Sequence, residues 1–182
     1  QKGDPTSIED PELLDTDGGF LALDGAYGIH KLLPIGNSLL AFATNGVWAI
    51  SGADGNYFAP TTPRVVKVSD RGSVSSGSVV AVGNTVVYWT TDGIYHISVT
   101  GAETYELNNI TKSTIQSLYS DIPYTSKVLV EGKYDEYSSE IIWVVNNLID
   151  RDSETYLIKM LTTTSAFTIH KMKDGLIGRT VL

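Results

Sequence analysis

A segment of the chain occurs twice, and the spacing of its two copies constrains the fold more than any other feature. Residues 83–98 read GNTVVYWTTDGIYHIS, and residues 36–51 read GNSLLAFATNGVWAIS, so the copies align without a gap at an offset of 47 residues. Glycine, asparagine, threonine and isoleucine recur at matching positions, and aromatic residues replace one another. A repeat of this length predicts a fold built from similar units placed side by side.

Each copy reads as a β-hairpin, because an apolar run is followed by a turn dipeptide and a second apolar run. Asn-Gly in the first copy and Asp-Gly in the second favour a type I′ turn, in which both central residues take a positive φ. The aromatic residues beside these turns are predicted to lie in the core. The predicted turn and core residues are Asn45, Gly46, Phe42, Trp48, Asp92, Gly93, Trp89 and Tyr95.

Short apolar runs bounded by Gly, Asn, Asp, Ser or Pro continue through the chain and predict many short strands. The predicted strands are 20–23, 29–35, 39–43, 47–50, 65–68, 79–82, 86–89, 94–97, 127–134, 140–146, 155–161 and 166–172. Runs such as LLAF and VVYW are continuous rather than alternating. Such strands have apolar side chains on both faces, so we expect them to lie between two packed layers.

About four strands recur every 40 to 50 residues, which is typical of the blades of a β-propeller. The sequence therefore predicts an all-β fold of blades with four short antiparallel strands. We expect an irregular acidic arm at 1–19, blades at 20–62 and 63–107, a helical connection at 108–126 and a diverged third blade at 127–182. Three blades cannot close a ring, since propellers have at least four. Further sequence or another subunit must then complete the ring.

One short helix is predicted near residues 113–121. Thr111 or Ser113 can cap its N-terminus, Ile115 and Leu118 share one face, and Pro123 ends it.

Composition narrows the classes of partner. The chain has 182 residues, no cysteine and a net charge of -8, which argues against a surface that grips nucleic acid through its phosphates. No uninterrupted apolar run reaches the roughly 18 residues of a membrane-spanning helix. Gln1 is not an initiator methionine, and we expect the chain to be part of a larger protein.

The sequence predicts no catalytic, cofactor-binding or metal-binding residues, and hence no enzyme. The histidines are His30, His96 and His170. They fall in separate strands without ligand spacing. Asp15 and Asp17 begin a calcium-loop pattern that is not completed. The cluster of Asp135, Glu136 and Glu140 has the residue types of a glycosidase acid–base pair, but its place in a tight turn favours a solvated tip.

Four segments together resemble the β-propeller portion of the tail tube and nozzle proteins of short-tailed phages, known as tubular protein B or DNA-stabilisation proteins. They are the hairpin GNTVVYWTTDGIYHI, its lead-in RVVKVSDRGSVSSGSVVAVG, the predicted helix IQSLYSDIP and the segment GKYDEYSSEIIWVVN. The resemblance covers residues 36–172. It implies a virion tail protein, a subunit of a homohexameric ring below the portal and adaptor, through which DNA leaves without sequence-specific binding. It carries over no catalytic residues.

A carbohydrate-binding or glycan-hydrolysing propeller is the alternative. Tyr57, Phe58 or Tyr124 would then stack on sugar rings. The segment Thr90–Tyr95 is similar to the Asp box of propeller sialidases, but Asp92 and Gly93 are adjacent, so the spacing of that box is not met.

Overall fold

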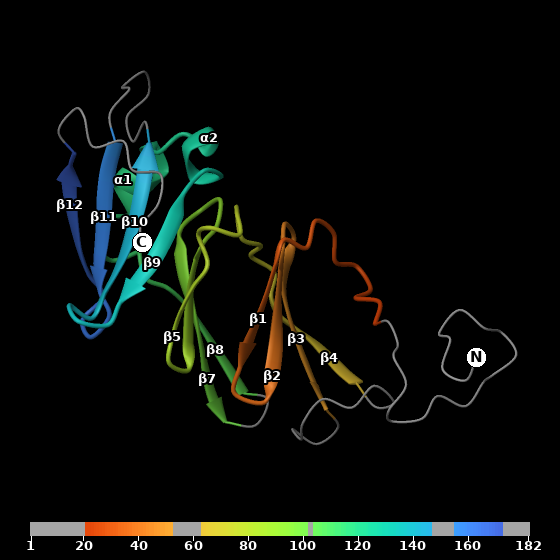
Figure 1. Cartoon of the computed structure of the whole chain (residues 1–182). Coiled ribbons are helices and arrows are strands. Elements are labelled where there is room, and N and C mark those ends of the chain that lie inside the picture. The colour runs from red at the N-terminus through yellow and green to blue at the C-terminus, as the bar shows by residue number, and fades with distance from the viewer. Residues whose placement is uncertain (1–20, 53–62, 102–103, 147–154, 173–182) are drawn as a thin grey trace, which may run out of the picture.

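The chain folds into three four-stranded antiparallel sheets that follow one another along the sequence and stand side by side like a fan (Figure 1). The computed structural model describes residues 21–52, 63–101, 104–146 and 155–172. In each sheet, every strand pairs with its neighbours in the chain. The predicted all-β fold with blade-like units is confirmed.

The strands of each sheet have the following bounds. The first sheet contains β1 (Lys31–Ile35), β2 (Ser38–Ala43), β3 (Gly46–Gly52) and β4 (Pro63–Ser69). The second contains β5 (Val80–Val82), β6 (Thr85–Trp89), β7 (Ile94–Gly101) and β8 (Thr104–Asn109). The third contains β9 (Glu131–Asp135), β10 (Glu140–Asn146), β11 (Thr155–Leu161) and β12 (Ala166–Lys171).

The boundaries of the sheets differ from the boundaries of the units expected from the repeat. Strand β4, placed by the sequence in the unit 63–107, pairs with β3 and completes the first sheet. Strand β8 was not predicted, although it pairs with β7 along most of its length. An offset of 47 residues sets the period of a repeat but not where each unit begins, and β4 and β8 do not align at that offset.

The positive-φ turns lie in a different place from the one predicted. Gly36 and Gly83 have φ of +55° and +56° in the two-residue turns that join β1 to β2 and β5 to β6. Glycine at the first central position, followed by a residue with negative φ, is the pattern of a type II′ turn. The predicted type I′ turns are wrong, because Asn45, Asp92 and Gly93 do not take a positive φ.

The aligned turns after β2 and β6 also differ in length. Ala43 pairs with Gly46 across a two-residue turn, whereas Trp89 pairs with Ile94 across the four-residue loop 90–93. Thr90 occupies the position of Ala43 in the longer loop, and its hydroxyl accepts hydrogen bonds from the amides of Asp92 and Gly93.

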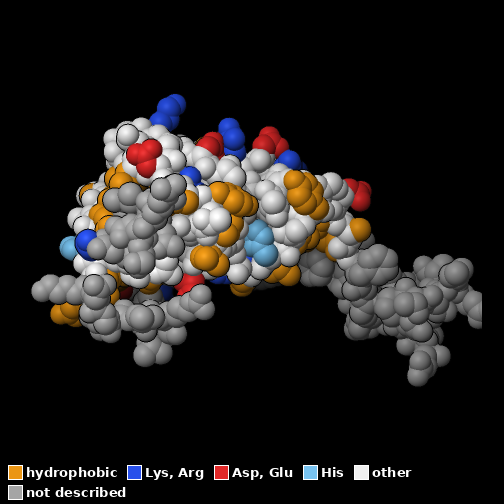
Figure 2. Space-filling model, turned by 90° about the horizontal axis from the view of Figure 1, so that it is seen from above, with side chains coloured by type: hydrophobic (Ala, Val, Ile, Leu, Met, Phe, Trp, Pro, Cys, Tyr) orange, Lys and Arg blue, Asp and Glu red, His pale blue; other side chains and the backbone are white. Residues whose placement is uncertain are grey.

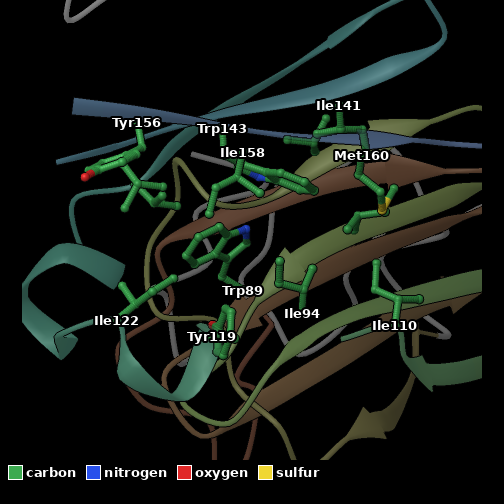
Figure 3. Packing of buried hydrophobic residues seen from close by; sticks show 14 residues of the cluster. Trp89, Ile94, Ile110, Tyr119, Ile122, Ile141, Trp143, Tyr156, Ile158 and Met160 are labelled. Carbon is green, nitrogen blue, oxygen red and sulfur yellow. The ribbon is translucent and has the colours of Figure 1, made fainter. Parts of the chain in front are cut away.

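Apolar side chains fill the two spaces between neighbouring sheets. Val86 and Tyr88 of β6 pack with Leu40 and Phe42 of β2 between the first and second sheets. The opposite face of β6 packs against the third sheet through Val87 and Trp89. Figure 3 shows Trp89 between Trp143 and Ile158 on one side and Tyr119 on the other. Strand β6 is therefore buried on both faces, as its continuous apolar run predicted.

The outer face of the first sheet is covered by residues 21–28, here called the strap. Leu23 and Ala26 pack against Trp48 and Ile50, which are almost fully buried. Residues 21–23, predicted as part of a strand, are not a strand in the structure. The strap is fixed by the side chain of Asn45, whose Nδ2 donates to the carbonyl of Gly25 (2.7 Å) and whose Oδ1 accepts from the amide of Tyr27 (3.2 Å).

Two short helices lie between the second and third sheets in the chain, α1 (Gln116–Asp121) and α2 (Tyr124–Lys127). The helix predicted near 113–121 is present, but its N-cap is Ile115, without a side-chain hydrogen bond, rather than Thr111 or Ser113. Pro123 caps the start of α2, so the third sheet begins at residue 131 instead of 127. Among the described residues no helix is long and apolar enough to cross a membrane.

Candidate functional site

The loop 90–93 between β6 and β7, here called the junction loop, holds the second sheet to both helices and to the end of the first sheet. Its conformation is set by Thr90, whose Oγ1 accepts from the amides of Gly93 (3.1 Å) and Asp92 (3.2 Å). The amide of Thr90 also donates to the carbonyl of Gly93 (2.9 Å). The loop is thus a closed, internally bonded turn before any other element contacts it.

Helix α1 is bound to the junction loop through two side chains. The hydroxyl of Tyr119 donates to the carbonyl of Thr90 (2.5 Å), and Nε2 of Gln116 donates to the carbonyl of Asp92 (2.9 Å). Tyr119 is fully buried, and this burial raises the pKa of its hydroxyl well above the usual range. The tyrosine therefore stays neutral and acts as a hydrogen-bond donor.

Helix α2 contributes a buried lysine. Lys127 is 5% exposed, and its Nζ donates to the carbonyl of Thr91 (3.3 Å) and lies 4.3 Å from the ring centroid of Tyr119. Desolvation lowers the pKa of Lys127, while the carboxylate of Asp92 raises it. A cation over an aromatic ring is stabilised by the ring quadrupole, so Lys127 joins α2 to both α1 and the junction loop.

The carboxylate of Asp92 faces the linker between the first two sheets. Its Oδ2 lies 3.3 Å from the Arg71 guanidinium and accepts from the hydroxyl of Tyr95 (3.3 Å). The side chains of Arg71 and Asp92 are about half exposed, at 55% and 40%, so the pair adds little to stability.

Gly93 is required at this site by crowding rather than by its backbone angle. A Cβ at Gly93 would lie 2.6 Å from Nδ2 of Asn109 and 2.8 Å from Oγ1 of Thr111. Both side chains are fixed, because Oδ1 of Asn109 accepts from the amide of Thr111 (3.0 Å) and from its hydroxyl (2.7 Å).

A second junction lies where the first strands of the three sheets begin. Nζ of Lys31 in β1 donates to the carbonyls of Ser76 (3.2 Å) and Val79 (2.8 Å), and the amide of Gly132 in β9 donates to Gly77 (2.8 Å). A cavity of about 380 Å³ adjoins these contacts. It is lined by Lys31, Ser75, Ser76, Gly77, Val128, Leu129, Val130, Glu131 and Gly132. Two donors beside it, Nζ of Lys31 and the amide of Gly132, are already bonded to neighbouring segments.

Two of the three carboxylates at 135–140, those of Asp135 and Glu140, have structural partners. Asp135 accepts from the amide of Tyr137 (3.1 Å) and the hydroxyl of Ser138 (2.7 Å). The hydrogen bond from Ser138 is the main cause that lowers the pKa of Asp135, whereas a general acid needs a raised one. Glu140 forms an ion pair with Lys159 at 3.4 Å. Asp135 is thus a hairpin cap, and Glu140 neutralises a lysine.

The histidines are not brought together, since His30 precedes β1, His96 lies in β7 and His170 lies in β12. Nδ1 of His30 contacts the carbonyl of Gly28 (3.0 Å), and its Nε2 lies 2.5 Å from Oγ of Ser73. This resembles a nucleophile with its base.

Ser73, however, is 2% exposed, and its amide donates to the carbonyl of Ala43. The next amide, of Val74, donates to Trp89, so neither can stabilise an oxyanion. Among the described residues, no group of three His, Asp or Glu side chains is placed to hold a metal ion.

Of the aromatic residues proposed to stack on sugars, Tyr124 begins α2 and is 58% exposed. Tyr57 and Phe58, and the acidic residues Asp15 and Asp17, lie outside the described residues.

Sequence reasoning placed Asp92, Gly93, Trp89 and Tyr95 in a hairpin but did not find the junction. The burial of Lys127 and its contact with the junction loop were not predicted, because a lysine in a polar segment gives no indication that it is buried. Asn45 was assigned a turn role, and its contacts with the strap depend on residues 20 positions away. Thr90 had a local signal, since threonine two and three residues before Asp-Gly can form a side-chain turn.

Comparisons with known proteins add little to this picture. No family model matches the sequence, and no curated protein matches it. A solved structure with some likeness is the N-terminal domain of Nup159, with a TM-score of 0.45 and 12% sequence identity. The match covers 80% of this chain and 37% of that one, so the chain spans well under half of that domain.

Proposed function

We propose that this chain is a structural component of a phage tail, part of a nozzle subunit that forms the channel through which DNA leaves the virion. The observation that carries the proposal is the outer face of the third sheet. Ile142, Val144, Leu157 and Leu161 lie on that face by their strand register and are half-buried. Blades bury such faces against a neighbour, and three blades are too few to close a propeller.

The use of polar groups supports a structural role. At the junction loop and at Lys31, side-chain donors from the helices and from β1 are bonded to backbone carbonyls of loop residues that border the second sheet. Groups committed in this way hold elements in place. A catalytic group must instead have a free atom that faces a substrate.

The charge distribution suits a channel for DNA. The net charge of -8 disfavours tight binding to phosphates. On the face seen in Figure 2, lysine and arginine side chains are separated and interleaved with acidic ones rather than gathered into a basic patch. DNA would then pass without being held.

The partners are identical subunits, and tail adaptor and portal proteins. The resemblance of residues 36–172 to nozzle proteins supports a ring of six subunits. The test is mass measurement in solution followed by electron microscopy of the particles. Six-fold rings with a central channel are expected. A monodisperse monomer that binds or cleaves glycans would favour the alternative, in which exposed Tyr124 stacks on sugar.

A further inference from the structure

Asn45-Gly46 is the single Asn-Gly dipeptide in the sequence, and it lies in the turn between β2 and β3. This dipeptide is prone to deamidation, because glycine has no Cβ to keep its amide away from the preceding side chain. The nitrogen of Gly46 bonds to Cγ of Asn45, the bond from Cγ to Nδ2 breaks, and the amide proton of Gly46 leaves with the ammonia. Water then opens the resulting succinimide to aspartate or isoaspartate, so the reaction requires no other reagent.

In the folded chain, both polar atoms of the Asn45 side chain are held by the strap. Nδ2 donates to the carbonyl of Gly25 (2.7 Å), and Oδ1 accepts from the amide of Tyr27 (3.2 Å). Gly46 is buried, and a Cβ added to it would lie 2.6 Å from the carbonyl of Ser69, so its backbone is closely packed. Attack on Cγ requires Asn45 to rotate relative to Gly46, and the contacts with the strap oppose this rotation.

The further contacts of the strap with the first sheet are modest. Leu23 and Ala26 pack on that sheet but are only half-buried, and the amide of Thr44 donates to the carbonyl of Tyr27 (3.2 Å). Segments with few buried contacts detach locally more often than the strands beneath them. Each detachment of the strap releases the side chain of Asn45 for attack.

Deamidation also removes the donor that fixes the strap. Aspartate has an oxygen in place of Nδ2, so a negatively charged acceptor would face the carbonyl of Gly25, where a donor now lies 2.7 Å away. Isoaspartate adds a methylene group to the main chain and disturbs the two-residue turn as well. We propose that Asn45 is a modification site whose deamidation releases the strap and uncovers Trp48 and Ile50, at a rate set by how often the strap detaches.

The corresponding dipeptide of the second copy, Asp92-Gly93, is held differently. The amide of Gly93 donates to Oγ1 of Thr90 (3.1 Å), and the carboxylate of Asp92 lies 3.3 Å from the guanidinium of Arg71. The nucleophile and the group that it would attack are therefore both engaged within the described residues. Isomerisation of an aspartate also leaves the mass unchanged, so mass measurement distinguishes it from deamidation at Asn45.

The first test measures the rate of deamidation in the full chain at mildly alkaline pH, by peptide mapping with mass spectrometry and by labelling with isoaspartyl methyltransferase. Leu23→Ser weakens the strap and should accelerate the reaction at Asn45 by about tenfold. Leu118→Ser is the matched control, because Leu118 is also half-buried but packs between the second and third sheets. Circular dichroism verifies that both variants are folded. The native wild type should react more slowly than the same chain unfolded in urea.

Equal rates in Leu23→Ser and Leu118→Ser, or equal rates in the native and the unfolded wild type, would show that the strap does not protect Asn45. The second test examines the product. Asn45→Asp should make the amides of residues 21–28 exchange with solvent deuterium severalfold faster than in the wild type. Asn84→Asp adds the same charge in the exposed turn between β5 and β6 and should follow the wild type. Equal exchange of the strap in the two Asp variants would overturn its release.

Discussion

The indole rings of Trp89 and Trp143 lie 5.9 Å apart, tilted by 59°, across the interface between the second and third sheets. Both side chains are fully buried, and Tyr119 packs on Trp89 with ring centroids 5.1 Å apart. Trp89→Ala should therefore lower the free energy of unfolding by about 3–5 kcal/mol, since it empties the centre of that core. Urea denaturation followed by circular dichroism measures this loss. A change within error would mean that Trp89 lies at the surface.

The two tryptophans should respond differently to phenylalanine. Nε1 of Trp143 donates to the carbonyl of Ser78 (3.3 Å), whereas Nε1 of Trp89 is buried with no hydrogen-bond partner among the described residues. Trp143→Phe leaves a buried carbonyl without its donor, and Trp89→Phe removes a donor that has no acceptor. We expect Trp143→Phe to cost about 1 kcal/mol more than Trp89→Phe in the same denaturation assay. Equal costs would indicate that a water molecule satisfies Trp89.

The substitutions Gly93→Ala and Gly83→Asn distinguish two reasons for a glycine: lack of space for a side chain at Gly93, and a positive φ at Gly83. Gly93→Ala should destabilise by more than about 1 kcal/mol, because the new methyl meets Asn109 and Thr111. Gly83→Asn should cost much less, since asparagine tolerates a positive φ and a Cβ at Gly83 meets no atom within 4 Å. Melting temperatures compare the two. Adding Asn109→Ala to Gly93→Ala should cost less than the sum of the single changes, and strict additivity would contradict crowding.

Stability should fall steeply above pH 10. Burial raises the pKa of Tyr88 and of Tyr119 far above the usual 10.0. Above that pH the unfolded chain loses these protons while the folded chain keeps them, so each tyrosine removes about 1.4 kcal/mol per pH unit. Below pH 10 this contribution is fully present. The lowered pKa of Lys127 acts in the opposite direction and offsets part of the loss up to pH 10.5.

The measurement is the urea midpoint at a series of pH values from 8 upward. Tyr88→Phe and Tyr119→Phe should each make the alkaline decline about half as steep, since each removes one of the two ionisations. Tyr137→Phe, which alters a fully exposed side chain, is the control and should follow the wild type. A decline that neither buried variant alters would assign the alkaline unfolding to other groups.

Ser139 and Ser165 end hairpin loops of the third sheet with φ of 55° each. A serine in the left-handed region is strained, so Ser139→Gly and Ser165→Gly should each stabilise by about 0.5–1 kcal/mol. This net gain is the relieved strain minus the larger conformational entropy that glycine loses on folding. Calorimetric melting tests this. Ser138→Gly is the matched change, and it should destabilise because it removes the hydrogen bond to Asp135. A loss of stability at both Ser139 and Ser165 would contradict the strain.

The sequence predicted most strands because alternation, continuous apolar runs and turn residues are local signals. Trp89 and Phe42 were placed in the core on that basis, and both are fully buried. Strand β8 was missed although its residues alternate, because the helix signals follow it directly and the whole segment was interpreted as a break in the strand pattern. The turn type failed at Asp92-Gly93 because the hydroxyl of Thr90 competes for the amides of the loop.

The junctions were not predictable, because they join residues that are distant in the chain. The carbonyl of Thr91 meets Lys127, 36 positions later, and Val79 meets Lys31, 48 positions earlier. Nothing in the composition around a lysine indicates which carbonyl its ammonium will reach. Such contacts follow from the angle between sheets, and that angle is fixed by the packing of side chains such as Trp143 and Tyr88.

The order of strand pairing has a consequence for how the molecule is made. Every sheet is built from hairpins between consecutive strands, and within the described residues no strand pairs with a strand of another sheet. The first sheet can therefore be completed while the third is still inside the ribosome, and each later sheet adds to a finished surface. Arrays of this kind nucleate locally and grow by neighbour contacts. Synthesis from the N-terminus would then assemble the stack in order, from the first sheet to the third.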